Sequence, residues 1–202
     1  MNYIEHIGKY FLMLVQVFKK PQKNRVFYEA LMKEIEELGL KSLGIIIFIS
    51  FFIGGVIALQ TALNLDSPFI PDSLIGFAAK RSIILEFAPT FCSIILAGKV
   101  GSYITSSIGA MRVTEQIDAL EVMGINSLSY LVLPKVLSTV FFYPFLIILA
   151  MIMGIFGGWV TGVLSGLFTG ADYIIGIQTT FDPFLITYAM IKTLVFAFLI
   201  AT

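Results

Sequence analysis

The sequence predicts an all-α integral membrane protein. Its 202 residues are 58% hydrophobic and only 13% charged, whereas about 25% of the residues of a soluble domain are charged. Its mean hydropathy is +0.95. Long apolar stretches, close to or above the roughly 20 residues that a spanning helix needs, are separated by short polar segments. We therefore expect one membrane domain over residues 1–202 and no separate soluble domain.

The first 41 residues are predicted to form two helices that lie in the membrane interface. Apolar side chains recur there at helical spacing, and charged side chains lie off the apolar stripe, as in an amphipathic helix at a membrane surface. Pro21 is expected to end the first helix. The second helix is expected over residues 24–39, with Gly39 as its stop. Charged residues among the first apolar ones argue against a signal peptide.

Four apolar stretches are predicted to span the membrane: residues 42–65, 82–111, 127–169 and 184–202. The first contains 24 uncharged residues, enough for one span. The third contains most of an uncharged region that runs from Val136 to Ala171, longer than one span needs. We therefore expect a long or tilted helix there, followed by a re-entrant or loop-like tail.

The segments between these stretches are expected to be loops or short helices. Residues 66–81 and 172–183 are interpreted as external loops, because Pro and Asp residues mark them. The fourth stretch reaches Thr202 without a flanking charge, which is rare for a natural span. We therefore expect a truncated chain that lacks the rest of this helix and a further one.

A short polar segment, MRVTEQIDALEVMG at residues 111–124, separates the second and third stretches. It is too short and too charged to span a bilayer, so we expect a compact helix. Thr114 is its predicted N-cap and Gly124 its predicted end, while Glu115 suits the positive end of the helix dipole. One face carries Ile117, Leu120 and Met123, and the other carries Glu115, Asp118 and Glu121. Such an amphipathic helix is suited to docking onto something outside the membrane.

The positive charges predict the orientation of the chain. Lys and Arg number seven in residues 1–41, two in 66–81, two in 112–135 and none in 170–183. Cytoplasmic segments carry the excess of Lys and Arg. A cytoplasmic N-terminus gives nine positive charges inside against two outside, so the polar segment is expected to face the cytoplasm.

Three charged residues interrupt the apolar stretches: Glu86, Lys99 and Lys192. Charges inside a membrane are costly and need a partner or water. Glu86 and Lys192 are expected at comparable depths, so they can form a pair. That pair either fixes helix packing or lines a cavity for a charged or zwitterionic head group.

Glycine recurs every fourth residue in the third stretch, at Gly154, Gly158, Gly162, Gly166 and Gly170. Glycine at this spacing lets another helix approach closely. The groove serves either packing within one subunit, which we favour, or a subunit interface. The second stretch has a similar surface of small residues, at Gly98, Gly101, Ser102, Ser106 and Gly109.

Several classes of site are excluded or disfavoured. The single cysteine, Cys92, rules out an intrachain disulfide and a cysteine metal cluster. His6 is interpreted as a solvated residue, and carboxylates three apart on one helix converge poorly on a cation. No phosphate-binding GxxxxGK[ST] loop occurs, no nucleophile–base pair is visible, and zero net charge gives no indication of nucleic-acid binding. We expect no enzyme activity and no directly bound cofactor, so energy must come from a partner or an ion gradient.

The stretch from Glu86 to Pro134 resembles the MlaE (YrbE-type) permease family of ABC transporters that export or import lipids. The matching runs are EFAP at 86–89, AGKVGS at 97–102, GAMRVTEQIDALEVMGI at 109–125 and YLVLPKVL at 130–137, with weaker matches in ALQ at 58–60 and IKTLVF at 191–196. EQIDALEVMG is highly specific. One departure is LEFAP where the family often reads RELGP, which puts Leu85, the bulky Phe87 and Ala88 at the changed positions.

The resemblance implies a homodimeric permease in the inner membrane that moves phospholipid between that membrane and the periplasm or outer membrane. It implies five spanning helices, the fifth beyond Thr202, and a periplasmic partner with an MCE domain. A cytoplasmic ATPase would bind ATP and Mg and grip residues 112–124 as a coupling helix. The expected ATPase contacts are Arg112, Glu115, Gln116, Asp118, Ala119, Leu120, Glu121, Met123 and Gly124. The expected lipid-cavity residues are Gln60, Glu86 and Lys192.

Two other classes of protein remain open at this point. An ion-gradient-driven secondary transporter would use Glu86, Lys99 and Lys192, with the first two as a proton relay. A membrane scaffold would transport nothing. Co-purification of a nucleotide-binding subunit would favour the ABC permease over both.

Overall fold

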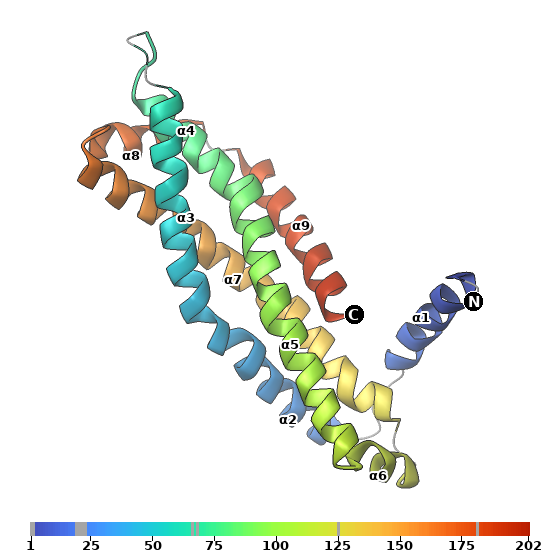
Figure 1. The fold of residues 1–202 in the computed structure, drawn as a ribbon. Coiled ribbons are helices and arrows are strands. Elements are labelled where there is room, and N and C mark those ends of the chain that lie inside the picture. Colours follow the sequence, from blue (N-terminus) through green and yellow to red (C-terminus); the bar gives the residue numbers. More distant parts are fainter. Residues whose placement is uncertain (1–2, 19–23, 66, 68, 125, 181) are drawn as a thin grey trace.

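The computed structural model describes residues 3–18, 24–65, 67, 69–124, 126–180 and 182–202. The regular structure of these residues is entirely helical. Within this part of the chain, four helices are long and apolar enough to cross a membrane: Phe27–Asn64, Ser73–Val113, Ser127–Ser165 and Pro183–Ala201. They run alongside one another in an elongated bundle (Figure 1). The chain is thus an all-α, multi-pass membrane protein with four visible spans, as the sequence predicts.

The first long helix is continuous but irregular. It consists of α2 (Asn24–Glu34), a π-helical turn η1 (Ile35–Gly39), a 3₁₀ turn η2 (Leu40–Ser42) and α3 (Leu43–Asn64). The prediction that Gly39 stops a helix is therefore wrong. Gly39 is buried, and a Cβ there would lie 2.5 Å from the ring of Phe142. Glycine is needed at this position for close packing and not to end the helix.

The N-terminal helix α1 (Tyr3–Val17) precedes this element and lies to one side of the bundle (Figure 1). It exposes Phe11, Leu12 and Val15, a surface that suits a membrane interface. Its interfacial position stays a prediction. The expected break at Pro21 lies outside the described residues.

The second long helix begins earlier than predicted. It consists of α4 (Ser73–Ser82), a π-helical segment η3 (Ile83–Phe91) and α5 (Cys92–Val113). Residues 73–81, interpreted from sequence as part of a loop, are helical. They pack on α8 (Gly170–Gln178), where the backbones meet so closely that a Cβ at Gly76 would lie 2.3 Å from the carbonyl oxygen of Tyr173. This tertiary packing outweighs the local turn signals.

A short helix, α6 (Gln116–Val122), joins the second long helix to α7 (Ser127–Ser165), whose 39 residues confirm the prediction of a long third helix. Asn126 caps α7 by accepting a hydrogen bond from the Ser129 N–H at 3.3 Å. Gly166 ends α7 with a φ of 70°, a conformation that glycine adopts without strain.

The predicted loop over residues 172–183 is largely helical, because residues 172–178 belong to α8 and Pro183 begins the next helix. The hydroxyl of Thr169 caps α8 by accepting from the Asp172 N–H at 3.2 Å. Tyr173 of α8 is buried and stacks on Phe168, and burial raises its pKa to about 12. The last helix, α9 (Pro183–Ala201), starts with proline in its first turn, where a missing N–H costs nothing.

Glycines let α3 and α7 pack backbone to backbone. A Cβ at Gly54 would lie 1.9 Å from the carbonyl oxygen of Gly154, and one at Gly158 would lie 3.2 Å from that of Gly54. The favoured prediction, that the glycines of the third span serve packing within the subunit, is confirmed for these positions. By contrast, a Cβ at Gly98, Gly101 or Gly109 of α5 would meet nothing within 4 Å.

Candidate functional site

Glu86 and Lys192 form the predicted pair. The Nζ of Lys192, on α9, lies 3.0 Å from Oε2 of Glu86, on η3. The Lys192 side chain is 20% exposed and that of Glu86 is 64% exposed. The carboxylate is therefore held from one side and open on the other.

Lys192 also contacts the main chain of η3. Pro89 lies inside η3 and has no N–H, so the carbonyl of Leu85, four residues earlier, lacks its α-helical donor. Lys192 Nζ donates to that carbonyl at 3.3 Å. The ammonium thus binds a side chain and a backbone group of the same irregular segment.

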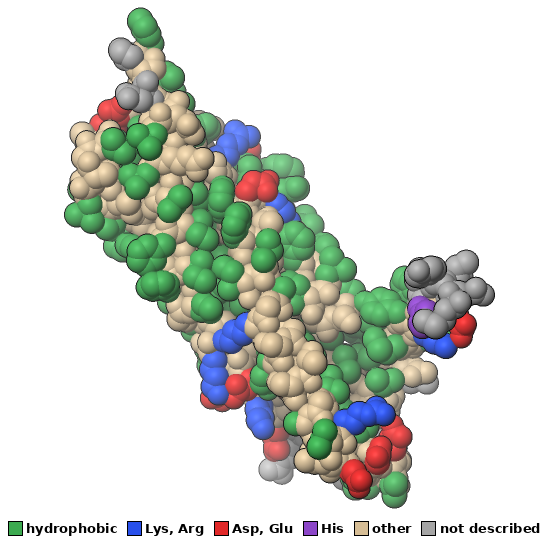
Figure 2. Space-filling model, viewed as in Figure 1, with side chains coloured by type: hydrophobic (Ala, Val, Ile, Leu, Met, Phe, Trp, Pro, Cys, Tyr) green, Lys and Arg blue, Asp and Glu red, His purple; other side chains and the backbone are tan. Residues whose placement is uncertain are grey.

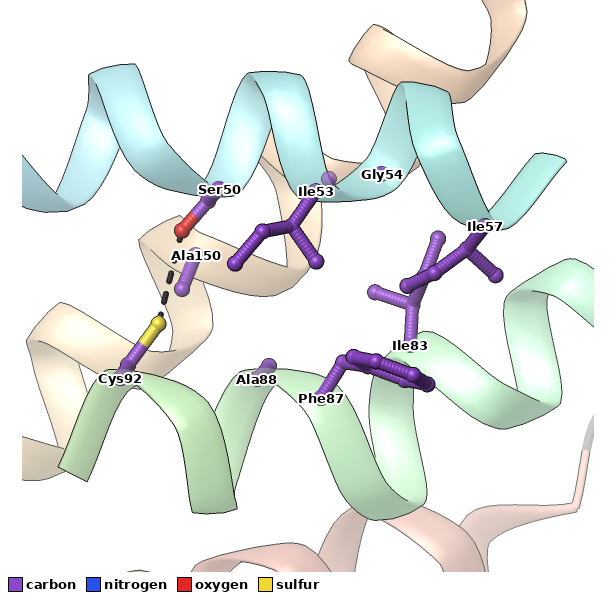
Figure 3. Close-up of a pocket in the computed structure, with 10 residues that line it drawn as sticks. Ser50, Ile53, Gly54, Ile57, Ile83, Phe87, Ala88, Cys92 and Ala150 are labelled. Atoms are coloured by element: carbon purple, nitrogen blue, oxygen red, sulfur yellow. Dashed lines mark hydrogen bonds between the residues drawn. The ribbon is translucent and has the colours of Figure 1, made fainter. Parts of the chain in front are cut away.

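Gln60, the third residue expected at a lipid cavity, is not joined to this pair. It is exposed on α3, and no hydrogen bond among the described residues connects it to Glu86 or Lys192. The space between α3 and η3 is filled mainly by apolar side chains, which leave a pocket of only about 10 Å³ (Figure 3). Ser50 and Cys92 close one end of this pocket with a 3.5 Å hydrogen bond (Figure 3). One water fills such a volume, so the interior between these two helices cannot hold a phospholipid.

Lys99 is distant from this pair. It lies thirteen residues beyond Glu86 on one continuous helix, which corresponds to about 20 Å, and its Nζ donates to the carbonyl of Lys41. A direct proton relay between Glu86 and Lys99 has no structural support. The ion-driven alternative is therefore not favoured.

The helix α6 presents an exposed surface at one end of the bundle. It has no buried residue. The most exposed apolar side chains are those of Val122 on α6 (89%), Val113 at the end of α5 (85%) and Met123 just after α6 (64%). Glu115, Asp118 and Glu121 are exposed as well. Figure 2 shows acidic side chains gathered at the end that carries α6. Apolar and acidic groups thus lie side by side on this surface.

The bounds of α6 differ from the prediction for residues 112–124. Arg112 and Val113 belong to α5, and Met123 and Gly124 follow α6. Thr114 is not the N-cap, because its hydroxyl donates to the carbonyl of Ala110 at 2.8 Å. The residue before α6 is Glu115, with a φ of 58°. The predicted left-handed conformation of Gly124 is confirmed by its φ of 73°.

Two buried lysines were missed by the sequence analysis. Lys80 of α4 donates to the carbonyls of Ile177 at 2.8 Å and Thr179 at 2.9 Å, at the end of α8. Lys135 of α7 is 2.6 Å from Oε1 of Glu34. A sequence signal for Lys135 existed, because it is flanked by apolar residues in YLVLPKVL. Lys80 has no such sequence signal, because it belongs to residues 66–81, which the sequence pattern indicates as a loop.

The comparisons with known proteins agree with this architecture. The family model described as Permease MlaE matches residues 31–202. A probable ABC transporter permease protein of Rickettsia bellii is 30% identical over 98% of this chain and 76% of its own length. The intermembrane phospholipid transport system permease protein MlaE of Haemophilus influenzae is 30% identical over 98% of this chain and 80% of its own. The chloroplast protein TRIGALACTOSYLDIACYLGLYCEROL 1 of Arabidopsis thaliana is 30% identical over 92% of this chain and 53% of its own. Since the family model covers most of its length, this chain belongs to the MlaE permease family.

Proposed function

We propose that this chain is the permease subunit of an ABC transporter that moves phospholipid between the inner membrane and the periplasm or outer membrane. The observation that carries the proposal is the exposed helix α6, held between two spanning helices, in a member of the MlaE permease family. The name of the Haemophilus relative, which specifies intermembrane phospholipid transport, supports the choice of substrate.

In this proposal α6 is the coupling helix, and the ATPase subunit supplies the energy. The ATPase binds ATP and Mg, and this chain catalyses no bond-making step. The exposed apolar side chain of Val122 would enter a groove of the ATPase, while Asp118 and Glu121 would face its polar rim. Arg112 at the end of α5 and Gly124 after α6 extend the contact on either side.

The lipid site is proposed to lie on a surface shared by two copies of the chain. The interior between α3 and η3 is too small for a phospholipid, whereas Glu86 has an open side. A second copy facing Glu86 and Lys192 would enclose a cavity, and Gln60 on α3 would line it further toward the end of that helix. An ammonium and a carboxylate suit the two charges of a zwitterionic head group.

The proposed setting is the inner membrane with the N-terminus in the cytoplasm. The excess of Lys and Arg in residues 1–41 supports this orientation. It places α6 on the side where ATP is available and the opposite end of the bundle toward an MCE-domain partner in the periplasm.

A double charge reversal in α6 tests the coupling. We expect Asp118→Lys with Glu121→Lys to leave the membrane fold intact, because both side chains are exposed, and to abolish stimulation of the ATPase. The measurement is ATP hydrolysis and phospholipid transfer by the permease–ATPase complex in proteoliposomes. We expect transfer to fall at least tenfold.

The matched control is Glu5→Lys, which reverses an exposed acidic residue of α1, outside α6 but on the same proposed side of the membrane. We expect transfer in this variant to stay within twofold of that of the wild type. Unchanged transfer by the α6 double variant would refute the proposal.

A further inference from the structure

A buried charge cluster lies beside the two helices that carry α6. Lys135 of α7 is 3% exposed, and its Nζ donates to Oε1 of Glu34 at 2.6 Å and to Oγ of Ser107 at 3.2 Å. The same nitrogen lies 4.8 Å from the centre of the Tyr103 ring. The ammonium is thus placed among a carboxylate, a hydroxyl and an aromatic face.

The three hydrogen-bonded residues come from three different helices. Ser107 lies six residues before the end of α5, and Lys135 lies eight residues after the start of α7. These offsets correspond to about 9 Å and 12 Å along the helices. Because α6 connects α5 to α7, the Lys135–Ser107 hydrogen bond links the two helices between which α6 is held. Glu34, the last residue of α2, connects the first long helix to the same cluster through its ion pair with Lys135.

The cluster also lies at the start of the irregular part of that helix. Directly after Glu34 the helix becomes π-helical and then 3₁₀ over residues 35–42. Such irregular turns inside a helix often mark hinges. We call residues 35–42 the joint. Both α5 and α7 contact it: Gly39 packs against Phe142 of α7, and Lys99 of α5 donates to the carbonyl of Lys41.

We propose that Lys135 is a positioning residue for transport: with Glu34 and Ser107 it transmits the movement of α6 to the joint at residues 35–42, and so to α3. The inference rests on the proposed function. A displacement of α6 moves the ends of α5 and α7. The ion pair obliges α2 and the joint to follow, because a buried carboxylate that is separated from its partner is costly.

The test compares Lys135→Met with an exchange of the two charges in the complex of the full chain with its ATPase. Methionine keeps most of the side-chain length and removes the charge. The charge exchange, Glu34→Lys with Lys135→Glu, restores an ion pair at the same place. The control is Lys9→Met, which removes a different ion pair, between Lys9 and Glu5. The side chains of these two residues are 68% and 62% exposed, respectively.

Two quantities are measured for each assembled complex. The first is the change in amide hydrogen exchange of residues 35–42 between the nucleotide-free and the ATP-bound complex. The second is phospholipid transferred per ATP hydrolysed. We expect Lys135→Met to reduce the first at least threefold and the second at least fivefold. We expect the exchanged pair to recover at least half of each and Lys9→Met to stay within twofold of the wild type.

Either of two results would overturn the inference: no exchange response at residues 35–42 in the wild type, or an assembled Lys135→Met complex that keeps both responses. If that variant fails to assemble, Glu34→Gln and Ser107→Ala decide by the same criteria, since each keeps the size of the site. Failure of the proposed function is distinguishable. A wild type that moves no phospholipid refutes the function, while the exchange response still reports on the joint, because it needs only the ATPase and nucleotide.

Discussion

Lys192 and Lys135 both lie among apolar helices, but their carboxylate partners differ in exposure. The side chains of Lys135 and Glu34 are 4% and 13% exposed, whereas that of Glu86 is 64% exposed. Removing one partner of a buried pair costs about 3–5 kcal/mol, whereas the open side of Glu86 leaves room for a second partner. The first pair is therefore suited to holding helices together. The second is suited to exchanging one partner for a ligand.

Replacing Lys192 by Leu tests the role of the open pair. We expect phospholipid binding by the purified complex to weaken at least fivefold, because the cation that would meet the head-group phosphate is lost. Size-exclusion chromatography should show unchanged assembly of the proposed dimer and of its proposed complex with the ATPase. Loss of assembly with undiminished binding in the remaining complex would instead assign the pair to helix packing.

The sequence predicts some of these residues and not others for a physical reason. Glu86 and Lys192 are predictable as a pair because each interrupts an apolar span at a depth that the topology fixes. The partners of Lys99 and Lys80 are backbone carbonyls, which no residue pattern identifies. Lys135 binds a residue 101 positions away, so only the fold brings the two together.

Helices of this chain are shaped as much by contact with one another as by local sequence. Long apolar stretches predict the four spans because burial in lipid requires helical backbone. Helix ends are harder to predict, because residues 73–81 and 172–178 look like loops and become helical where α4 and α8 pack together. The π-helical segments η1 and η3 have no sequence signature beyond Pro89 in η3. At η1, Gly39 packs closely against Phe142 of α7.

Two glycine substitutions in α3 test the backbone contact between α3 and α7. In Gly54→Ala the new Cβ would lie 1.9 Å from the carbonyl oxygen of Gly154, so the helices must separate. We expect the free energy of unfolding to fall by about 1–3 kcal/mol, the usual cost of overpacking. Gly44→Ala is the matched control, because its Cβ meets nothing within 4 Å and alanine favours helix by up to about 1 kcal/mol.

The measurement is the thermal unfolding midpoint of the purified chain in detergent. The midpoint should fall for Gly54→Ala and stay or rise for Gly44→Ala. Equal shifts for the two variants would show that the contact between α3 and α7 is looser than the structure has it.

The molecule as a whole is a bundle with two unlike ends. One end carries α6 and, nearby, α2, and the other carries α4 and α8 (Figure 1). Charged side chains on the visible face gather mainly at the α6 end, while hydrophobic side chains cover much of the surface between the ends (Figure 2). This polarity agrees with the excess of Lys and Arg in residues 1–41. The proposed coupling therefore requires that the two ends face opposite sides of the membrane.

Single cysteines at the two ends test this orientation. Val122 on α6 is 89% exposed, and Phe69, between α3 and α4, is 95% exposed. Each is replaced by Cys in a Cys92→Ser background, which removes the one native thiol. We expect an impermeant maleimide to label position 69 in intact spheroplasts and position 122 only in inverted vesicles. The chain is expressed without its ATPase and periplasmic partner, so both thiols are accessible and a failure to react reports the side of the membrane and not burial. Labelling of position 122 from the periplasmic side would place α6 where no ATPase can reach it, and the transport mechanism proposed for this chain would then be untenable.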